Sequence, residues 1–475
     1  MQALIHPLTE LADYEEIVKN KRKGPGAIRI LGCVNSQKTH MMYGLSDGCR
    51  YKVIICSSES KAKQIYEEYR FLDRSVYLYP AKDLLFYQAD LRSKELVRER
   101  MEVLEAVIEG RPLTVVASFD ALMDSLLPKE IIAGRTIRVS YDGTLELSTM
   151  EKALADLGYE RVVQIEGPGQ FAVRGGILDV FPLTEELPVR IELWGDEVDS
   201  IRTFDVESQR SIENLTEVSI SPSIEFPGEG EQGVSFLDYF PADETLLFLD
   251  EPVRLMEKGQ GVEEEFIEAQ KKRVESGYEL KDGEVRLYGT EEILNRINTY
   301  SSIGFYALDM RCKGLLIRES YHIQAKSVNP YNSSFELLTQ DLKRLKRNGY
   351  RVVLLSGSRT RAKRLAEDLR DYNLSSYYSD DLDRLAEPGE IMTAYGHVAE
   401  GYEYPMLKFT VISETDIFGK VKKKKKRKTY EGRKIQSFSE LKPGDYVVHE
   451  NHGLGIYQGI EIGRASCRER VYRLV

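Results

Sequence analysis

The chain has 475 residues, of which 42% are hydrophobic and 30% are charged. A chain of this length cannot be built around one core, so three or more domains are expected. No apolar stretch approaches the ~18 residues that a membrane span needs, and the N-terminus lacks the basic start and apolar core of a signal peptide. The net charge of -11 argues against a surface that binds nucleic acid throughout. We therefore expect a soluble, cytoplasmic protein that does not contact membranes.

The cysteines and histidines give no pattern of metal ligands. The five cysteines are Cys33, Cys49, Cys56, Cys312 and Cys467. An odd number without close paired spacing favours a reducing compartment and argues against a zinc site. His449 and His452 lie close together, but no cysteine or third ligand is near them. We expect them to be strand and turn residues, and no metal site is predicted.

Residues 1–135 alternate short apolar strands with amphipathic helices. The predicted elements are strands at 27–31, 52–56 and 113–118 and helices at 60–72 and 97–110. Ser57 or Ser58 can cap the first helix, and Gly110 ends the second. A strand followed by a capped helix is typical of a parallel α/β sheet.

The stretch LGCVNSQKTH, residues 31–40, resembles a phosphate-binding loop with one residue changed. Gly32 stands six residues before Lys38 and Thr39, which is the spacing of G-x-x-x-x-G-K-[ST], but Gln37 occupies the position of the second glycine. A glycine there lets the backbone approach a phosphate, and a side chain obstructs it. The pattern therefore predicts a RecA-like fold whose nucleotide site has degenerated.

A pair of acids ends a later apolar strand. In LLFLDEP, residues 246–252, Asp250 and Glu251 hold the place of the acids that bind magnesium in phosphate-loop enzymes. Such a pair is also common at an ordinary solvated strand end, and Lys38 and Thr39 also fit the start of an ordinary helix. We favour the interpretation that these residues form an ordinary strand end and an ordinary helix start, and we keep a weak nucleotide site as the alternative.

From residue 136 to 222 the pattern changes to short strands separated by turns. The predicted strands are 136–140, 161–166, 170–182, 188–195 and 198–205, with one helix at 149–159. This pattern indicates an antiparallel β-rich domain inserted into the first α/β domain. That first domain is expected to resume at residues 223–330.

The alternation along two of these strands places a tryptophan and two arginines on the solvent side. The residues predicted to face outward are Arg190, Glu192 and Trp194 on one strand and Ala172 and Arg174 on another. Exposed Trp and Arg are the residue types that dominate protein–protein hot spots. A plain surface pair, with Arg190 stacked on Trp194, fits the spacing equally well.

The remainder of the chain divides into three parts. Residues 331–419 follow the rhythm of a second α/β domain, with helices at 334–349 and 358–373 and strands at 350–357, 390–395 and 408–414. Residues 420–436, with KVKKKKKRK at 420–428, are interpreted as a solvated basic linker, and loose phosphate contact is the alternative. Residues 437–461 are spaced like the opening strands of a small β-barrel.

Two stretches carry a resemblance to a known family. FAVRGGILDVFPLTEELPVRIELWGDEVDSIRTFDVESQRS, residues 171–211, is similar to the module shared by the excision-repair protein UvrB and the bacterial transcription-repair coupling factors. LKPGDYVVHENHGLGIYQG, residues 441–459, resembles the start of the Tudor-like domain by which these coupling factors bind the β subunit of RNA polymerase. The resemblance to the coupling factors extends from residue 1 to about residue 461.

The resemblance implies a function and two sets of binding residues. Family members displace RNA polymerase that has stalled at DNA lesions and recruit UvrA for nucleotide excision repair. The UvrA-binding positions fall on Arg174, Arg190 and Trp194, where other members can have Phe in place of the tryptophan. The polymerase-binding segment includes Val447, His449, His452, Gly453 and Gly455.

The resemblance also implies what these 475 residues do not contain. In the family, ATP, magnesium and most of the DNA contact belong to two further RecA-like domains that follow the polymerase-binding domain. UvrB clamps DNA with an aromatic hairpin, but residues 79–103 are too few to hold one, and Tyr79, Phe86 and Tyr87 are expected in a core. Residues 462–475 depart from the family and resemble a translated sequencing adapter, so no function is assigned to them.

Two hypotheses follow from the sequence. The first is a UvrA-recruiting scaffold that is α/β and multidomain, with a degenerate RecA-like domain, an inserted β-rich domain, a second α/β domain and a truncated Tudor-like barrel. It has no catalytic residues and no cofactor of its own. The second is a weak nucleotide-binding domain or a UvrB-like DNA-binding domain. The nucleotide site would comprise Gly32, Gln37, Lys38, Thr39, Asp250 and Glu251.

Overall fold

The computed structural model describes residues 1–82, 94–227, 231–275 and 287–419, together with the backbone of three strands between residues 446 and 473. The chain divides into two compact units, one of residues 1–85 with 94–421 and one of residues 86–93 with 422–475. Among the helices that are described, none is long and apolar enough to cross a membrane.

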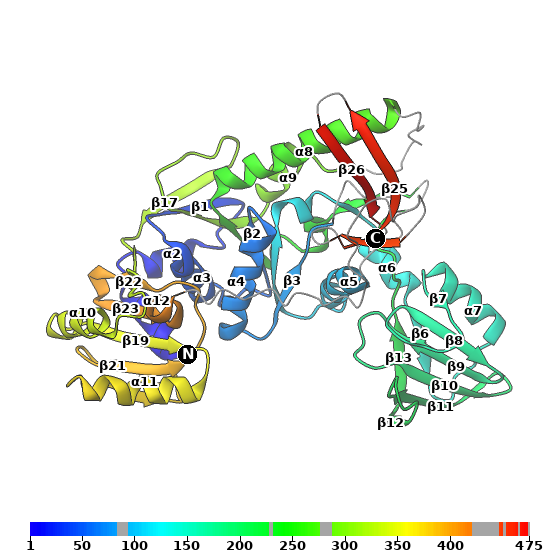
Figure 1. The fold of residues 1–475 in the computed structure, drawn as a ribbon, viewed down its shortest axis with the longest axis horizontal. Coiled ribbons are helices and arrows are strands. Elements are labelled where there is room, and N and C mark those ends of the chain that lie inside the picture. The colour runs from blue at the N-terminus through cyan, green and yellow to red at the C-terminus, as the bar shows by residue number, and fades with distance from the viewer. Residues whose placement is uncertain are drawn as a thin grey trace. The chain divides into compact units, whose positions relative to one another are not determined.

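A seven-stranded parallel sheet is the largest sheet in the described part of the first unit (Figure 1). Its strand order is β17-β1-β16-β15-β2-β4-β3, and every neighbouring pair is parallel. The strands are β1 (Gly26–Leu31), β2 (Tyr51–Cys56), β3 (Val76–Tyr79), β4 (Leu113–Ser118), β15 (Thr245–Asp250), β16 (Ser301–Tyr306) and β17 (Ile317–His322). Four strands precede the β-rich segment and three follow it, so the sheet is complete only after the chain returns from that segment.

Helices cover both faces of this sheet. They are α1 (Gln2–Ile5), α2 (Tyr14–Asn20), α3 (Asn35–Gly44), α4 (Glu59–Leu72), α5 (Lys94–Ile108), α6 (Lys129–Arg135), α8 (Pro252–Glu275) and α9 (Thr290–Ile297), with short 3-10 helices η1 (His6–Glu10), η2 (Phe119–Leu122) and η3 (Phe236–Tyr239). The Ser58 hydroxyl accepts the Lys61 N–H at 3.3 Å and caps α4. Gly110, with φ +71°, follows α5. The predicted cap and stop are thus confirmed.

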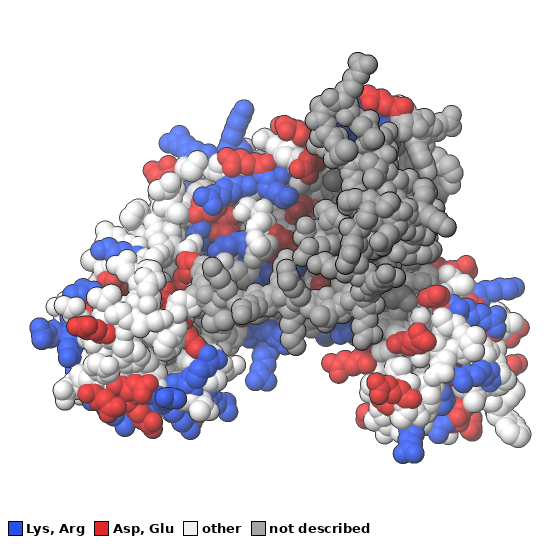
Figure 2. Space-filling view, in the orientation of Figure 1, with Lys and Arg blue, Asp and Glu red and all other residues white. Residues whose placement is uncertain are grey.

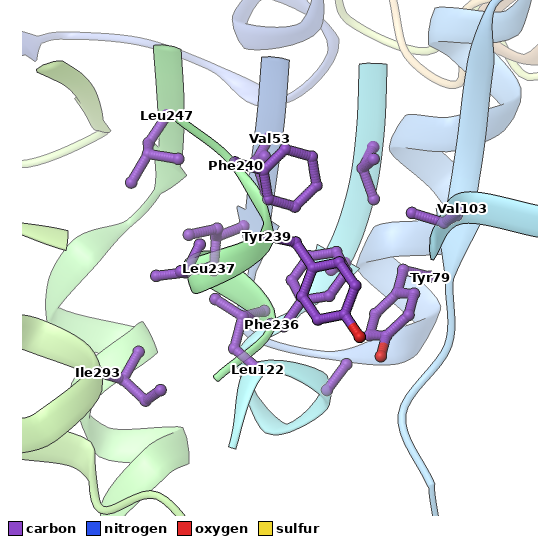
Figure 3. Packing of buried hydrophobic residues seen from close by; sticks show 14 of the residues in the cluster. Val53, Tyr79, Val103, Leu122, Phe236, Leu237, Tyr239, Phe240, Leu247 and Ile293 are labelled. Carbon is purple, nitrogen blue, oxygen red and sulfur yellow. The ribbon is translucent and has the colours of Figure 1, made fainter. Parts of the chain in front are cut away.

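Side chains of each central strand alternate between two hydrophobic cores. On β2, Val53 and Ile55 enter the core with α5, α8 and α9, whereas Ile54 and Cys56 enter the core with α3 and α4. A strand that is buried on both faces must be apolar at every position, which explains the continuous apolar runs. In the first core Tyr79 stacks on Phe236 with ring centroids 4.0 Å apart (Figure 3). Tyr79 is therefore a core residue as predicted; Phe86 and Tyr87 lie outside the described residues.

A buried ion cluster joins this core to the end of the β-rich segment. Arg100 on α5 is fully buried, and its Nε donates to Glu225 Oε2 at 2.8 Å. Its Nη1 lies 2.9 Å from Asp124 Oδ2. The Glu225 carbonyl accepts the Leu127 N–H at 2.8 Å, so the side chain and the backbone of Glu225 both hold the chain where it returns from the β-rich segment. Buried charges of this kind need their partners, and nothing in the sequence pattern indicated that these three belong together.

The β-rich segment forms a six-stranded sheet in the order β12-β11-β10-β9-β8-β7. The strands are β7 (Glu160–Arg161), β8 (Gln170–Arg174), β9 (Ile177–Phe181), β10 (Val189–Trp194), β11 (Glu197–Phe204) and β12 (Ser211–Leu215). The helix α7 (Leu147–Asp156) and the antiparallel pair β6 (Ile137–Ser140) and β13 (Glu217–Ile220) complete its core. A further short antiparallel pair, β5 (Ser125–Leu126) and β14 (Val234–Ser235), lies outside this segment and packs in the core of the parallel sheet with α5, α8 and α9.

Two sequence predictions for this segment are wrong. The strand predicted at 161–166 is reduced to β7, because the N–H groups of Glu166 and Gly167 bond to the Gln170 side chain at 2.9 and 3.1 Å and not to a neighbouring strand. Ala172 was expected to face solvent but is 1% exposed. It lies in a small apolar cluster with Phe204 that the alternation of a single strand cannot indicate.

The second α/β region has a six-stranded sheet in the order β18-β22-β23-β19-β21-β20. Its elements are β18 (Lys326–Ser327), α10 (Phe335–Arg347), β19 (Arg351–Ser356), α11 (Arg359–Asp371), β20 (Tyr377–Ser379), β21 (Ile391–Tyr395), β22 (Tyr402–Tyr404), η4 (Pro405–Leu407), β23 (Phe409–Ser413) and α12 (Glu414–Phe418). The long elements were predicted. The strands β18, β20 and β22 were missed, because two or three residues are too few to show a period.

The two α/β regions share one hydrophobic core. Val352 and Leu354 of β19 pack with α10 and α11, whereas Val353 and Leu355 point to the other face. There they join the cluster that contains Ile28 of β1 together with residues of α3 and α4. One face of the second sheet is thus covered by the first α/β region and not by helices of its own.

The second unit contains a three-stranded antiparallel sheet in the order β24-β25-β26. The strands are β24 (Tyr446–His449), β25 (Gly453–Gly463) and β26 (Ser466–Arg473). Strands in residues 437–461 were predicted. The basic run 420–428 lies outside the described residues.

Candidate functional site

The glycine of the loop after β1 is required by packing within the chain. Gly32 has φ +77°, a conformation that L side chains rarely adopt. A Cβ at this position would lie 2.3 Å from the Ile323 carbonyl oxygen. The glycine therefore needs no bound phosphate to explain it.

Two backbone N–H groups of this loop already have partners within the chain. The Cys33 N–H donates to the Tyr306 carbonyl at 3.1 Å, and the Val34 N–H donates to Gln37 Oε1 at 3.1 Å. A phosphate loop works by directing such groups into one concavity, where they bind the anion. Gln37 is fully buried, so its side chain occupies the position that the second glycine leaves open.

Lys38 is held by the two acids that end β15. Its Nζ lies 2.7 Å from Asp250 Oδ1 and 2.6 Å from Glu251 Oε1, and the Lys38 and Asp250 side chains are 6% and 4% exposed. Burial by itself lowers the pKa of Lys38, but the charges of Asp250 and Glu251 outweigh burial and the net effect is a raised pKa. The structure thus brings together the lysine and the acid pair that the sequence singled out, but as an internal ion pair.

A segment of the second α/β region covers the loop. The Ser36 hydroxyl donates to Glu68 Oε1 at 2.7 Å, and the same oxygen accepts the Ala399 N–H at 3.0 Å. The Glu400 N–H donates to the Ser36 hydroxyl at 3.1 Å, and Gln37 Nε2 donates to the Tyr404 hydroxyl at 3.1 Å. The residues between 399 and 404 therefore pack against the loop and the first turn of α3.

The space left beside Thr39 is too small for a nucleotide. The Thr39 hydroxyl is buried and has no hydrogen-bond partner in the described chain. It lines a cavity of about 10 Å³ with Ser36, Glu68 and Tyr402. A cavity of ~10–15 Å³ holds a single water molecule. The residues present therefore do not fit ATP with magnesium, and no catalytic step is assigned to this site.

We expect millimolar Mg-ATP to leave the melting temperature of the chain unchanged, because a ligand stabilises only what it binds. The measurement is thermal unfolding with and without nucleotide, for the parent and for Gln37→Gly, which restores the glycine of the pattern. The variant should also show no shift, since Lys38 remains paired and Tyr404 remains in place. A melting temperature of the parent that increases with nucleotide concentration would instead support the weak nucleotide site.

His40 extends the buried network from the loop to the N-terminal helix. The Tyr404 hydroxyl donates to His40 Nδ1 at 3.0 Å, and His40 Nε2 donates to the Leu4 carbonyl at 2.7 Å. His40 also stacks on Tyr402, with ring centroids 5.1 Å apart. This arrangement is satisfied by a neutral imidazole, and complete burial lowers the pKa of His40 from 6.5 to about 4. The sequence analysis did not single out His40.

The candidate docking residues lie on the outer face of β8, β9, β10 and β11, which we call the docking face. Trp194 ends β10 and is 84% exposed, as the strand alternation predicts. It pairs with Glu197 across a two-residue turn in which Gly195 has φ +68°. A tight turn of this kind requires a positive φ and fixes where the tryptophan leaves the sheet.

The two arginines of the docking face differ in how they are held. Arg190 donates through Nε to Asp179 Oδ1 at 2.7 Å and through Nη2 to Asp179 Oδ2 at 2.9 Å. Its guanidinium lies 4.5 Å from the ring centroid of Phe204, and the side chain is 17% exposed. Arg174 donates to Asp179 Oδ2 at 3.2 Å and its side chain is 50% exposed. Arg190 therefore stacks on Phe204 and not on Trp194, which corrects the surface-pair interpretation.

The sequence analysis missed two members of this face. Asp179 is directly opposite Arg190 on β9, and Arg202 of β11 is opposite Arg190 on its other side. Arg202 forms an ion pair with Glu192, which was predicted to face outward. The alternation of β9 and β11 could have placed both residues, but only the strand register brings them to Arg190.

The predicted polymerase-binding residues fall in the second unit. Val447 and His449 belong to β24 and pair with Gly455 and Gly453 of β25. His452 lies outside the described residues.

Profiles of two known domain families match parts of the chain. The profile described as "UvrB interaction domain" matches residues 137–226, and the one described as "CarD-like/TRCF RID domain" matches residues 441–474. The first match contains the whole docking face. The second match extends into residues 462–475, which the sequence analysis interpreted as departing from the family.

Curated relatives match most of the chain. The transcription-repair-coupling factor of Bacillus subtilis (strain 168) is 29% identical over 519 residues, which covers 96% of this chain and 44% of the relative. The chain is a homologue of bacterial transcription-repair-coupling factors. The coupling factors of Staphylococcus haemolyticus and Staphylococcus aureus (strain MRSA252) are each 26% identical over 455 residues, covering 82% of this chain and 38% of theirs. The chain thus spans less than half the length of these relatives.

Proposed function

We propose that this chain is the recruiting scaffold of a transcription-repair coupling factor and that it binds UvrA through the docking face. The observation that carries the proposal is the exposure of Trp194 on the sheet of the domain that matches the UvrB interaction profile. An aromatic side chain that is 84% exposed leaves a large apolar surface in contact with water. Burying that surface against a partner is favourable, and this is why exposed tryptophans mark binding sites. Arg174, half exposed on the same face, supplies a charged group that fixes the orientation of the partner.

The second unit is proposed to bind the β subunit of RNA polymerase as part of a Tudor-like domain. Support comes from the match of residues 441–474 to a profile whose description names the coupling factors. Displacement of stalled polymerase, with its ATP, magnesium and most of its DNA contact, is proposed for the whole protein and is not assigned to residues of this chain. On the face that Figure 2 shows, basic and acidic side chains of the described residues are interspersed, so this face carries no broad basic patch for nucleic acid.

The test is calorimetric titration of UvrA into the chain, for the parent and for the double variant Arg174→Ala, Trp194→Ala. We expect the parent to bind and the variant to lose about 30-fold or more in affinity, the effect of removing a hot-spot residue. The melting temperature should change little, because Trp194 is exposed and Asp179 keeps its two hydrogen bonds from Arg190. Arg190 is left intact, since its removal would uncover Phe204 and confuse a folding defect with a lost contact.

The matched control is Leu337→Ala, which removes a side chain that is 54% exposed on α10, outside the docking face. It should bind UvrA like the parent. A folded parent that does not bind, or a double variant that binds equally well, would refute the proposal.

A further inference from the structure

The docking face concentrates positive charge on an acidic domain. Residues 137–226 contain 18 Asp and Glu but only seven Lys and Arg. Three of the seven, Arg174, Arg190 and Arg202, come together on the same face of neighbouring strands. An arginine cluster in an otherwise acidic surface is a local feature, so it marks where this domain can accept a negatively charged group.

Asp179 lies at the centre of this cluster and is itself inaccessible. Its carboxylate is 2% exposed and accepts three hydrogen bonds, one from Arg174 and two from Arg190. A buried carboxylate is stable only when it is paired and hydrogen-bonded, and here the two arginines provide the partners. Asp179 cannot touch a docked protein, but it determines where both guanidinium groups lie.

The two arginines are left with different capacities for a partner. Arg190 uses Nε and Nη2 on Asp179, donates from Nη2 to Gln209 Oε1 at 3.2 Å and stacks on Phe204. Arg174 makes a single hydrogen bond within the described chain, and its side chain is half exposed. A guanidinium has five N–H donors in a fork that matches a carboxylate. Arg174 therefore has donors to offer, whereas Arg190 has become part of the sheet surface.

We infer that Asp179 is a positioning residue that orients Arg174 toward a carboxylate of the docked protein. Arg190, which is bound to Asp179 and stacked on Phe204, forms part of the sheet surface that supports this contact. This inference rests on the proposed function and deepens it. The partner surface that fits is an acidic side chain beside an apolar pocket for Trp194. Of the two arginines that the family resemblance indicated, one makes the contact and one supports it.

The experiment measures the affinity of the chain for UvrA in the parent, Asp179→Asn, Arg174→Ala and the double variant. Asp179→Asn should weaken binding about tenfold, because an amide no longer neutralises and holds the two guanidinium groups. In the Arg174→Ala background the same change should have a smaller effect, since the residue through which Asp179 acts is gone. Rising salt should weaken the parent more than Arg174→Ala, as expected for a charged contact.

Two further variants separate positioning from folding. Val180→Ala removes a fully buried side chain on the core face of the same strand and should lower the melting temperature without changing affinity. Arg190→Lys keeps a cation beside Asp179 but loses the two-point contact, and it should weaken binding in the same direction if Asp179→Asn does not fold.

The outcomes distinguish the inference from the proposed function. No binding by the parent would refute the proposed function itself. If the parent binds UvrA and Asp179→Asn and Arg190→Lys bind with the same affinity as the parent, only the inference is overturned. It is also overturned if Asp179→Asn and Val180→Ala lose affinity equally, or if the effects of Asp179→Asn and Arg174→Ala on affinity are fully additive.

Discussion

Lys38→Met is expected to lower the free energy of unfolding by about 3–5 kcal/mol, the cost of stranding a buried charge by removing its partner. Asp250 and Glu251 would remain at the end of β15 without the cation that now lies within 2.7 Å of each. Glu251 would still accept the Ala307 N–H at 2.9 Å, but Asp250 is 3% exposed and would have no replacement from solvent. Guanidinium unfolding followed by circular dichroism measures the difference.

Lys63→Met is the matched control for this prediction. Lys63 also pairs with a carboxylate, Glu59 at 2.6 Å, but its side chain is 57% exposed on α4. Exposed pairs of this spacing contribute ~0.3–0.5 kcal/mol. Adding Asp250→Asn and Glu251→Gln to Lys38→Met should recover part of the lost stability, because the unpaired charges are then gone. Equal costs for Lys38→Met and Lys63→Met would contradict the buried ion pair.

The second large effect is a loss of stability at acidic pH that depends on His40. The unfolded histidine binds a proton near pH 6.5, but the buried His40 stays neutral until about pH 4. Its contribution to stability is therefore complete above pH 6.5 and is lost as the pH falls from 6.5 to about 4. At 1.36 kcal/mol for each unit of pKa shift, the loss amounts to about 3 kcal/mol. Unfolding free energies measured between pH 7.5 and pH 4.5 test this.

His40→Gln should be less stable than the parent at neutral pH but should lose less stability on acidification, because the titrating group is absent. His397→Gln, which alters an exposed histidine of the second α/β region, should follow the pH profile of the parent. If the profile of His40→Gln matches that of the parent, the buried histidine is not the group responsible.

The phosphate-loop pattern illustrates how far a motif can be followed in the sequence alone. The spacing of Gly32, Lys38 and the acid pair correctly selected residues that meet, because the carboxyl ends of β1 and β15 lie at one edge of a parallel sheet. The substitution of Gln37 also correctly indicated an obstructed loop. What fills the loop could not be predicted, since Tyr404 lies more than 360 residues away and belongs to a strand too short to show a period.

The docking face shows the same division. Strand alternation placed Trp194 in solvent, because the period of two is a local property of the backbone. The same alternation placed Ala172 wrongly in solvent, and it did not indicate that Arg190 is bound to Asp179 and stacked on Phe204. Those outcomes depend on Asp179 and Phe204, which reach the face from neighbouring strands through pairing register.

The sequence by itself determined the strands β1, β2 and β4, the cap of α4 and the stop after α5, and the exposed tryptophan, because these follow from the chemistry of residues close together in the chain. Only the tertiary structure decided that the loop after β1 is closed and that Arg174 and Arg190 share one carboxylate. Such contacts join residues from different strands and regions, and their energies come from burial and charge pairing that exist only once the chain has folded.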